Sequence, residues 1–212
     1  MKPIIGYYGF WVYLTYISLI SAVVGIFFAF EGEIMHALIC LMISGICDTV
    51  DGRVANLKER TEREKSYGIQ IDAFADIISF GALPAAIGYS IGQNFGSFGV
   101  WSIAIFSVYV LAALIRLAYF NVIEMELQDK NEKRTHYEGL PVTIVALIIP
   151  FVYAICIMFD LPLVPIYNVL LLVVACAFVM KVKIPKPKGR AKVVLCLIGV
   201  PTLIYIIVTG VM

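Results

Sequence analysis

The stretch IMHALICLMISGICDTVDGRVAN, residues 34–56, begins as a nearly uninterrupted apolar run and carries two aspartates, Asp48 and Asp51, near its end. A helix needs about 20 apolar residues to cross the hydrocarbon core of a bilayer. The run Ile34 to Val54 therefore predicts a membrane-spanning helix with carboxylates close to one of its ends.

The rest of the chain repeats this apolar pattern. Hydrophobic residues make up 61% of the 212 residues and charged residues only 15%, which is too apolar for a surface that faces water. Six more runs predict spans: Tyr8 to Phe30, Gly68 to Ile91, Val100 to Val122, Pro141 to Phe159, Val164 to Met180 and Val193 to Val211. The sequence thus predicts an all-α, polytopic membrane bundle of six to eight helices, most simply seven, with residues 1–212 forming one domain.

The basic residues between the runs predict how the chain is oriented. Lysine and arginine in short loops collect on the cytoplasmic side of a membrane. If Lys2 lies inside, all lysines and arginines between the spans lie inside as well, and Arg116 is the exception because it lies within an apolar run. An odd number of spans places the carboxyl terminus outside, whereas a final re-entrant pair broken at Pro201 returns it to the inside.

The connecting segments contain one clear helix start. Thr61 followed three residues later by Glu64 is typical of a capping box, so a helical turn should begin there and lead into the third span. The segment Glu124 to Gly139 lacks periodic apolar residues and is expected to be a surface loop. The basic tract that begins at Ile184 is expected to be a proline-interrupted linker.

Four acidic residues lie at or inside the ends of two spans. Asp48 and Asp51 are three apart on the second span, and Asp72 and Asp76 are four apart on the third, so each pair projects from one helix face. The spans are joined by an inner loop, which makes them antiparallel neighbours. We therefore expect the four carboxylates to converge, and because charges at membrane depth are costly, a cation should compensate them.

Oxygen ligands alone suit Mg²⁺, Mn²⁺ or Ca²⁺. Two such ions bridged by carboxylates can hold the attacking and leaving oxygens of a phosphoryl transfer. The alternative is an internal salt-bridge network with nearby arginines. Gly52 and Gly68 would let the backbone approach a bulky ligand, although glycines in membrane helices also serve as packing surfaces.

The stretches DTVDGRVAN, residues 48–56, and GIQIDAFAD, residues 68–76, resemble the CDP-alcohol phosphotransferase signature, D-x-x-D-G-x-x-A-R, a spacer, then G-x-x-x-D-x-x-x-D. The resemblance implies that two divalent cations, Mg²⁺ or Mn²⁺, are bound by Asp48, Asp51, Asp72 and Asp76. It also implies that Asp76 is the catalytic general base.

The same resemblance implies a nucleotide site after the second aspartate. Gly52 and Ala55 would contact the cytidine nucleotide, and Asn56 stands in this site where the family has an arginine. The spacer before Gly68 is also longer than usual. Lys58, Arg60 or Arg53 would then be placed to take over the contact with the nucleotide phosphates.

Two later stretches, RLAYFNV at residues 116–122 and EGLPVT at residues 138–143, look like the phosphatidylserine synthase branch of that family. The resemblance implies CDP-diacylglycerol and L-serine as substrates, phosphatidylserine and CMP as products, a homodimer, and a site that faces the cytoplasm from the cell membrane. Arg116 would either pair with a site aspartate or bind a substrate anion. Asn121 would either bind polar groups of the acceptor or cap its helix.

Three other functions are alternatives to transfer onto serine: transfer to another acceptor, binding without turnover, and transport. Glycerol phosphate or inositol-type acceptors should require more basic residues in the later spans, which offer only Arg116. A homologue that binds nucleotide lipid with impaired turnover is suggested by Asn56. A transporter would be expected to show inverted halves or helices broken at the midplane, whereas these acids cluster near one membrane surface. No nucleic-acid partner is expected.

Overall fold

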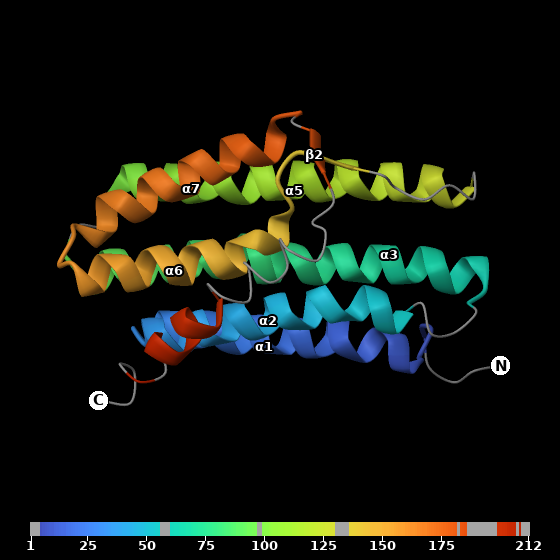
Figure 1. Ribbon diagram of the computed structural model, residues 1–212, viewed down its shortest axis with the longest axis horizontal. Coiled ribbons are helices and arrows are strands. Elements are labelled where there is room, and N and C mark those ends of the chain that lie inside the picture. The colour runs from blue at the N-terminus through green and yellow to red at the C-terminus, as the bar shows by residue number, and fades with distance from the viewer. Residues whose placement is uncertain are drawn as a thin grey trace.

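The computed structural model describes residues 5–55, 60–96, 99–129, 136–181, 183–185, 199–206 and 208. Helices dominate these residues: α1 (Tyr13–Phe30) after a 3₁₀ turn (Phe10–Val12), α2 (Ile34–Ala55), α3 (Glu62–Asp76), the π-helical segment η2 (Ile77–Ala82), α4 (Leu83–Asn94), α5 (Val100–Asp129), α6 (Val145–Met158) after the 3₁₀ turn η3 (Val142–Ile144), and α7 (Leu163–Val179). The long helices lie side by side along one axis (Figure 1). The predicted all-α class is confirmed.

Four helical stretches are long and apolar enough to cross a membrane: Phe10–Phe30, Ile34–Asp51, Glu62–Asn94 and Val100–Leu127. The apolar helices Val142–Met158 and Leu163–Val179 are shorter. The chain is therefore a polytopic helical membrane protein, and six of the seven predicted runs are helices. Of the seventh run, Val193 to Val211, only residues 199–206 and 208 are described, and they are helical. The rest of that run lies outside the described residues.

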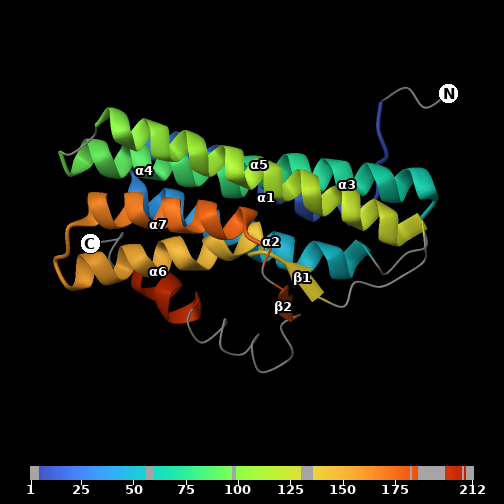
Figure 2. The ribbon, with the colours of Figure 1, turned by 90° about the horizontal axis from the view of Figure 1, so that it is seen from above.

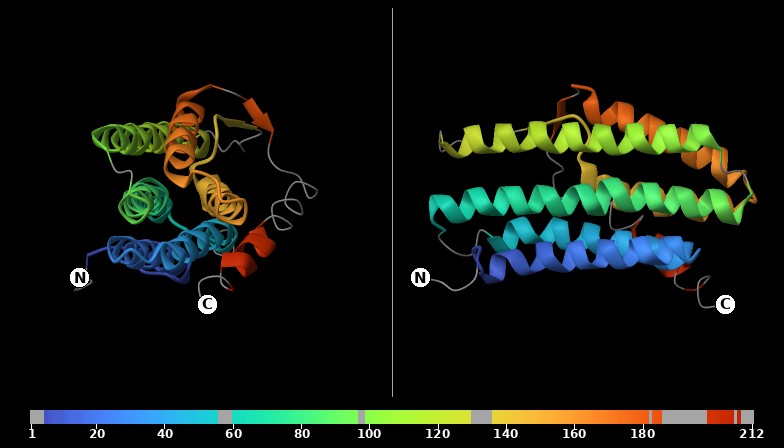
Figure 3. Two further views of the ribbon diagram at one scale, coloured as in Figure 1. Left: turned by 90° about the vertical axis from the view of Figure 1, so that its left-hand side faces the viewer. Right: turned by 180° about the vertical axis from the view of Figure 1, so that it is seen from behind.

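The helices form three layers. α1 packs most extensively on α2, the long α3–η2–α4 helix lies in the middle layer beside α6, and α5 packs against α7 on the far side (Figure 3). Their shared core is apolar, and its largest fully buried side chains include Tyr109, Tyr167 and Phe80. This arrangement packs α2 against the η2 and α4 parts of the long helix, whose first part, α3, carries the other half of the predicted site.

One expectation for the connecting segments is wrong. The predicted surface loop from Glu124 begins as helix, because α5 continues to Asp129. The same segment later forms a short strand, β1 (His136–Glu138), which pairs antiparallel with β2 (Lys183–Pro185) (Figure 2). Strands of three residues are too short to show an alternating pattern in the sequence, so their pairing could not be predicted.

The π-helical segment η2 follows directly after Asp76 and has an identifiable cause. Pro84 has no N–H, and its ring crowds the carbonyl four residues earlier, which belongs to Phe80. The helix widens there, so that the Leu83 N–H bonds to the Ile78 carbonyl. The hydroxyl of Tyr109 on α5 donates to the Phe80 carbonyl at 2.6 Å and so supplies the missing donor. The helix thereby continues through the proline.

Three buried serines tie the neighbouring helices together. The Ser44 hydroxyl donates to the Ser18 carbonyl at 2.9 Å, the Ser18 hydroxyl donates to the Ser44 carbonyl at 3.3 Å, and the Ser18 and Ser79 hydroxyls are 3.5 Å apart. Ser44 lies one turn before Asp48, and Ser79 lies about one turn after Asp76. These bonds therefore hold α1, α2 and η2 in register close to the aspartates.

Candidate active site

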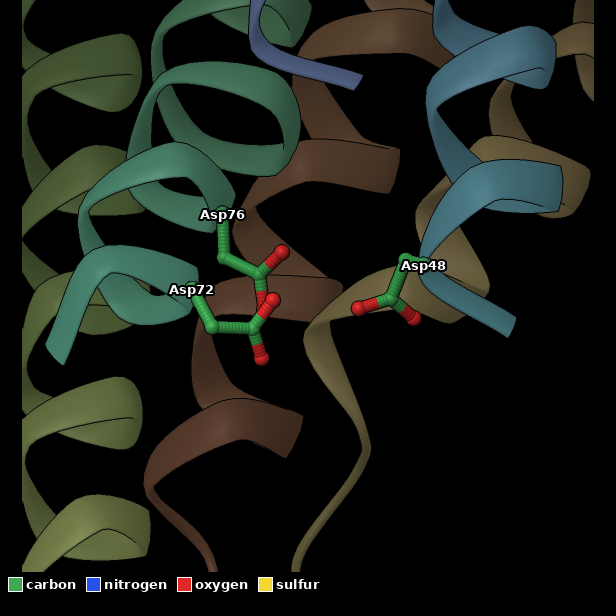
Figure 4. Close-up of side chains that lie close together, drawn as sticks. All are labelled: Asp48, Asp72 and Asp76. Carbon is green, nitrogen blue, oxygen red and sulfur yellow. The ribbon is translucent and has the colours of Figure 1, made fainter. Parts of the chain in front are cut away.

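Three aspartates from two helices meet between α2 and α3. Asp48 projects from α2, Asp72 and Asp76 project from α3, and the three carboxylate groups point toward one another (Figure 4). One carboxylate oxygen of each lies within 4.8 Å of the others. Asp48 and Asp72 are half-buried, whereas Asp76 retains only 8% of its surface exposed. We call these three residues the aspartate cluster.

The helix geometry explains why the cluster forms. Asp72 and Asp76 are one turn apart and so share a face of α3. Asp48 lies seven residues before the end of α2 at Ala55, and Asp72 lies ten residues after the start of α3 at Glu62, which are about 10 and 15 Å along antiparallel helices. The two positions therefore differ in depth by about one helical turn. The predicted convergence is seen for these three residues.

Asp51 lies beside the aspartate cluster. It is half-buried one turn after Asp48, and its side chain interacts with that of Asp72. The tight group of oxygens within 4.8 Å consists of the other three aspartates. The structure thus brings all four predicted aspartates into one region, with Asp51 at its edge.

The aspartate cluster fits a divalent cation. Ligand oxygens bind Mg²⁺ or Ca²⁺ at about 2.0–2.6 Å, so two ligands on opposite sides of one ion lie at most about 4–5 Å apart. The 4.8 Å limit that encloses the three oxygens meets this condition. Among the described residues, the ion pairs shown are His36 with Glu33 and Lys65 with Glu62, and neither touches the cluster. The spacing of the three oxygens therefore suits a divalent cation.

The start of α3 is fixed by the predicted capping box. The Thr61 hydroxyl accepts a hydrogen bond from the Glu64 N–H at 3.3 Å, and the Thr61 N–H donates to the Glu64 carboxylate at 2.9 Å. These bonds satisfy backbone donors that the first helical turn leaves without partners. The prediction is confirmed, and the cap sets where along the helix Asp72 and Asp76 fall.

The predicted nucleotide contacts lie near the end of the described part of α2. Gly52 and Ala55 belong to its last turns, and Gly52 is one turn after Asp48. Asn56 and Lys58 lie outside the described residues. The roles of Gly52, Ala55 and Asn56 stay predictions.

Gly68 makes room for two side chains of the protein itself. A Cβ at this position would lie 3.2 Å from an Nη of Arg60 and 3.3 Å from the Trp11 ring. The Arg60 guanidinium lies over that ring, 5.2 Å from its centroid. The sequence predicts that Gly68 lets the backbone approach a bulky ligand. It does not show that Arg60 and Trp11 fill the space beside this glycine.

Arg116 is buried, with 5% of its surface exposed, and two of its hydrogen bonds go to backbone carbonyls. Its Nε donates to the Leu140 carbonyl at 3.1 Å, and a terminal nitrogen donates to the Gly139 carbonyl at 3.4 Å. The backbone at Gly139 is constrained by its conformation and by its close neighbours. Gly139 has a φ of 78° and a Cβ there would lie 3.0 Å from the Met180 carbonyl oxygen, so only glycine fits without strain. Arg116 therefore anchors the Gly139–Leu140 turn against the end of α7.

The sequence contains both parts of this anchor, RLAYFNV and EGLPVT, but it does not show that they meet. We expected Arg116 to pair with a site aspartate or a substrate anion. The two hydrogen bonds described here go to the Gly139 and Leu140 carbonyls instead. The substrate role of Arg116 stays a prediction.

Asn121 is half-buried and lies eight residues before the end of α5 at Asp129. The idea that Asn121 caps the helix is wrong because the helix continues, and its contact with the acceptor stays a prediction.

Comparison with known proteins places this geometry in a family. The family model described as CDP-alcohol phosphatidyltransferase matches residues 12–181, a range that contains the four aspartates and the whole of helices α1 to α7. The chain belongs to this family. The resemblance seen in the two aspartate motifs is therefore confirmed over most of the chain.

Curated relatives narrow the comparison. The CDP-diacylglycerol–serine O-phosphatidyltransferase of Saccharomyces cerevisiae is 37% identical over 118 residues, which are 54% of this chain and 40% of that protein. The protein of the same name from Helicobacter pylori is 31% identical over 144 residues, 68% of this chain and 54% of the relative. The archaetidylserine synthase of Methanothermobacter thermautotrophicus is 29% identical over 140 residues, 66% and 55% respectively. The matches thus span about half the length of these relatives.

Proposed function

We propose that this chain is a membrane enzyme of phospholipid biosynthesis that transfers the phosphatidyl group of CDP-diacylglycerol to the hydroxyl of L-serine. The products are phosphatidylserine and CMP. The observation that carries the proposal is the convergence of Asp48, Asp72 and Asp76, with oxygens within 4.8 Å, in a chain of the CDP-alcohol phosphatidyltransferase family. The names of the three relatives above all specify serine, which supports serine as the acceptor.

Asp48, Asp51, Asp72 and Asp76 would hold two divalent cations, Mg²⁺ or Mn²⁺, which offset the negative charge of the pyrophosphate and of the departing CMP. Asp76 takes the proton from the serine hydroxyl as that oxygen attacks the phosphorus attached to diacylglycerol. The bond between this phosphorus and the CMP oxygen then breaks. A general base must lie within hydrogen-bond reach of the proton it removes. Asp76 is the least exposed member of the cluster, which keeps bulk water from competing for it.

The position of the site supports a lipid substrate. The aspartate cluster lies on helices that are long and apolar enough to cross a membrane, so acyl chains can stay in lipid while the headgroup reaches the carboxylates. The basic connections at the same end of α2 and α3 favour a cytoplasmic site in the cell membrane. Gly52, Ala55 and Asn56 would contact the cytidine nucleotide, and Arg116 or Asn121 the acceptor. We also expect the enzyme to be a homodimer.

The test is an acceptor assay with the purified full chain. CDP-diacylglycerol, Mn²⁺ or Mg²⁺, and labelled serine, glycerol phosphate or inositol are supplied in turn, and CMP and labelled lipid are measured. We expect CMP release and labelled phosphatidylserine with serine alone. Release with another acceptor would correct the acceptor, and no release with any of them would overturn the enzymatic function in favour of a binding homologue.

A further inference from the structure

α1 packs on both helices that carry the aspartate cluster, although it contributes no residue to the cluster. It lies against α2 and against α3, η2 and α4 of the long middle helix. Its residues, Tyr13–Phe30, include no acidic side chain. The position of Asp48 relative to Asp76 therefore depends in part on how α1 holds the two helices.

Ser18 is the residue through which α1 is hydrogen-bonded to both helices. Its hydroxyl donates to the Ser44 carbonyl on α2 at 3.3 Å, and the Ser44 hydroxyl donates to the Ser18 carbonyl at 2.9 Å. A serine hydroxyl carries a single hydrogen. At the 3.5 Å contact between the Ser18 and Ser79 hydroxyls, Ser79 is therefore the donor. We call Ser18, Ser44 and Ser79 the serine clasp.

The serine clasp is closed to solvent. Ser44 and Ser79 are fully buried, and Ser18 is 2% exposed. The hydrocarbon core of a membrane offers buried hydroxyls no water to bond instead. The two bonds between α1 and α2 also end on backbone carbonyls, so they fix one helix backbone against the other.

The serine clasp reaches Asp48 through one backbone group. In an α-helix the carbonyl of Ser44 accepts the N–H of the residue four positions later, which is Asp48. The Ser18 hydroxyl and the Asp48 N–H therefore meet at the same carbonyl oxygen. A shift of α1 along α2 would move this carbonyl and the backbone of Asp48 with it.

The serine clasp reaches Asp76 through the π-helical segment η2. Ser79 lies in η2, three residues after Asp76. The carbonyl of the next residue, Phe80, accepts the 2.6 Å hydrogen bond from Tyr109 on α5. A π-helical turn departs from the regular helical bonding pattern, so helix periodicity alone does not fix its geometry. The contacts from α1 and α5 hold the backbone that follows Asp76.

We propose that Ser18 is a positioning residue for the aspartate cluster. It sets the distance between Asp48 and Asp76, and through that distance the affinity and the spacing of the bound divalent cations. That the aspartate cluster binds cations rests on the proposed function. Ligands that are already in place before binding give a tighter site. The competing role is general stabilisation of helix packing, which would lower the melting temperature and leave the metal site unchanged.

The test compares Ser18→Ala with the matched control Ser21→Ala. The Ser21 hydroxyl donates to the Cys40 carbonyl at 3.0 Å, so the control removes the same kind of bond between α1 and α2, one turn farther from Asp48. Mn²⁺ binding to the purified full chain is measured by electron paramagnetic resonance. Both variants should melt at a lower temperature than the wild type. Mn²⁺ should bind more weakly to Ser18→Ala alone, by about two- to tenfold, the range of one net hydrogen bond.

Two further measurements separate positioning from stability. The magnetic coupling between neighbouring Mn²⁺ ions depends on their separation, so the resonance line shape should change in Ser18→Ala and stay unchanged in Ser21→Ala. Coupling between binding and conformation is reciprocal. Bound Mn²⁺ should therefore raise the melting temperature less in Ser18→Ala than in Ser21→Ala.

Ser79→Ala is the second variant, because it removes only the longest contact of the serine clasp and keeps the reciprocal bonds of Ser18 and Ser44. It should weaken Mn²⁺ binding in the same direction but less than Ser18→Ala. It replaces Ser18→Ala in the comparison if that variant does not fold.

Equal Mn²⁺ affinity and line shape in the clasp variant and in Ser21→Ala would overturn the inference, and so would a wild type that binds no Mn²⁺. Failure of the proposed function appears in a different measurement, the release of CMP with each acceptor. If the wild type binds Mn²⁺ but releases no CMP, the proposed function is wrong. The comparison of the serine variants then still decides whether Ser18 positions the aspartate cluster.

Discussion

Arg116 and the aspartate cluster are both charged groups on membrane-crossing helices, but they have different partners. Arg116 donates to the carbonyls of Gly139 and Leu140 and lies over the Phe120 ring. Asp48, Asp72 and Asp76 instead face one another, and among the described residues no ion pair joins them to a basic side chain. The fold itself supplies the partners of the arginine. The three carboxylates gather at the place where we propose that divalent cations bind.

The largest effect should come from changing the cluster. Asp76→Asn keeps the size of the side chain but removes the proposed base and a metal ligand, so CMP release should fall about 10²–10⁴-fold, the usual contribution of a positioned acid or base. The melting temperature without metal should stay equal or rise, because one of three clustered negative charges is gone.

The matched control for that variant is Asp160→Asn. Asp160 is an exposed aspartate in the turn after α6, and its φ of 50° is one that asparagine also tolerates. Its activity should equal that of the wild type. Near-normal turnover of Asp76→Asn with metal bound would show that Asp76 is not the base.

Changing Arg116 should have the next largest effect, and it should act on stability. Arg116→Gln leaves the buried Gly139 carbonyl and the half-buried Leu140 carbonyl without this donor, which costs about 1–3 kcal/mol for a buried unsatisfied group. We expect a clear fall in melting temperature in detergent, with KM for serine unchanged in the folded fraction. A raised KM for serine with an unchanged melting temperature would reverse the comparison and make Arg116 a substrate ligand.

A smaller effect is expected at Tyr109. Its neutral hydroxyl donates to one backbone carbonyl, whereas the charged guanidinium of Arg116 donates to two. Tyr109→Phe removes the 2.6 Å hydrogen bond to the Phe80 carbonyl in the π-helical segment. The loss should be about 1 kcal/mol, seen as a modest fall in melting temperature. Tyr13→Phe, at an exposed tyrosine at the start of α1, is the comparison variant. Equal melting temperatures for the two would mean that the hydroxyl of Tyr109 does not support the widened helix.

Local patterns in the sequence predicted the parts of the site that depend on one helix or on two consecutive ones. The spacing of Asp48, Asp72 and Asp76 fixed their faces, the short inner connection fixed the antiparallel pairing, and Thr61 with Glu64 marked the start of α3. These features need only helix periodicity and chain order.

Contacts between distant segments could not be predicted in this way. The carbonyls bound by Arg116 lie 23 and 24 residues further along the chain, and the turn that presents them is held by the end of α7. The contact of Arg60 with the ring of Trp11 joins the start of α3 to the 3₁₀ turn before α1. The predicted end of α5 is wrong because the helix continues beyond the apolar run to Asp129, where the sequence has no apolar periodicity to mark it.

Mn²⁺ binding to the purified protein, measured by electron paramagnetic resonance, shows whether the aspartate cluster holds divalent cations. The wild type and Asp160→Asn should each bind about two Mn²⁺ per chain, as expected for a two-metal phosphoryl-transfer site. The double variant Asp48→Asn, Asp72→Asn should lose this binding while keeping its helical circular dichroism. Unchanged Mn²⁺ binding in the folded double variant, or none in the wild type, would contradict the account.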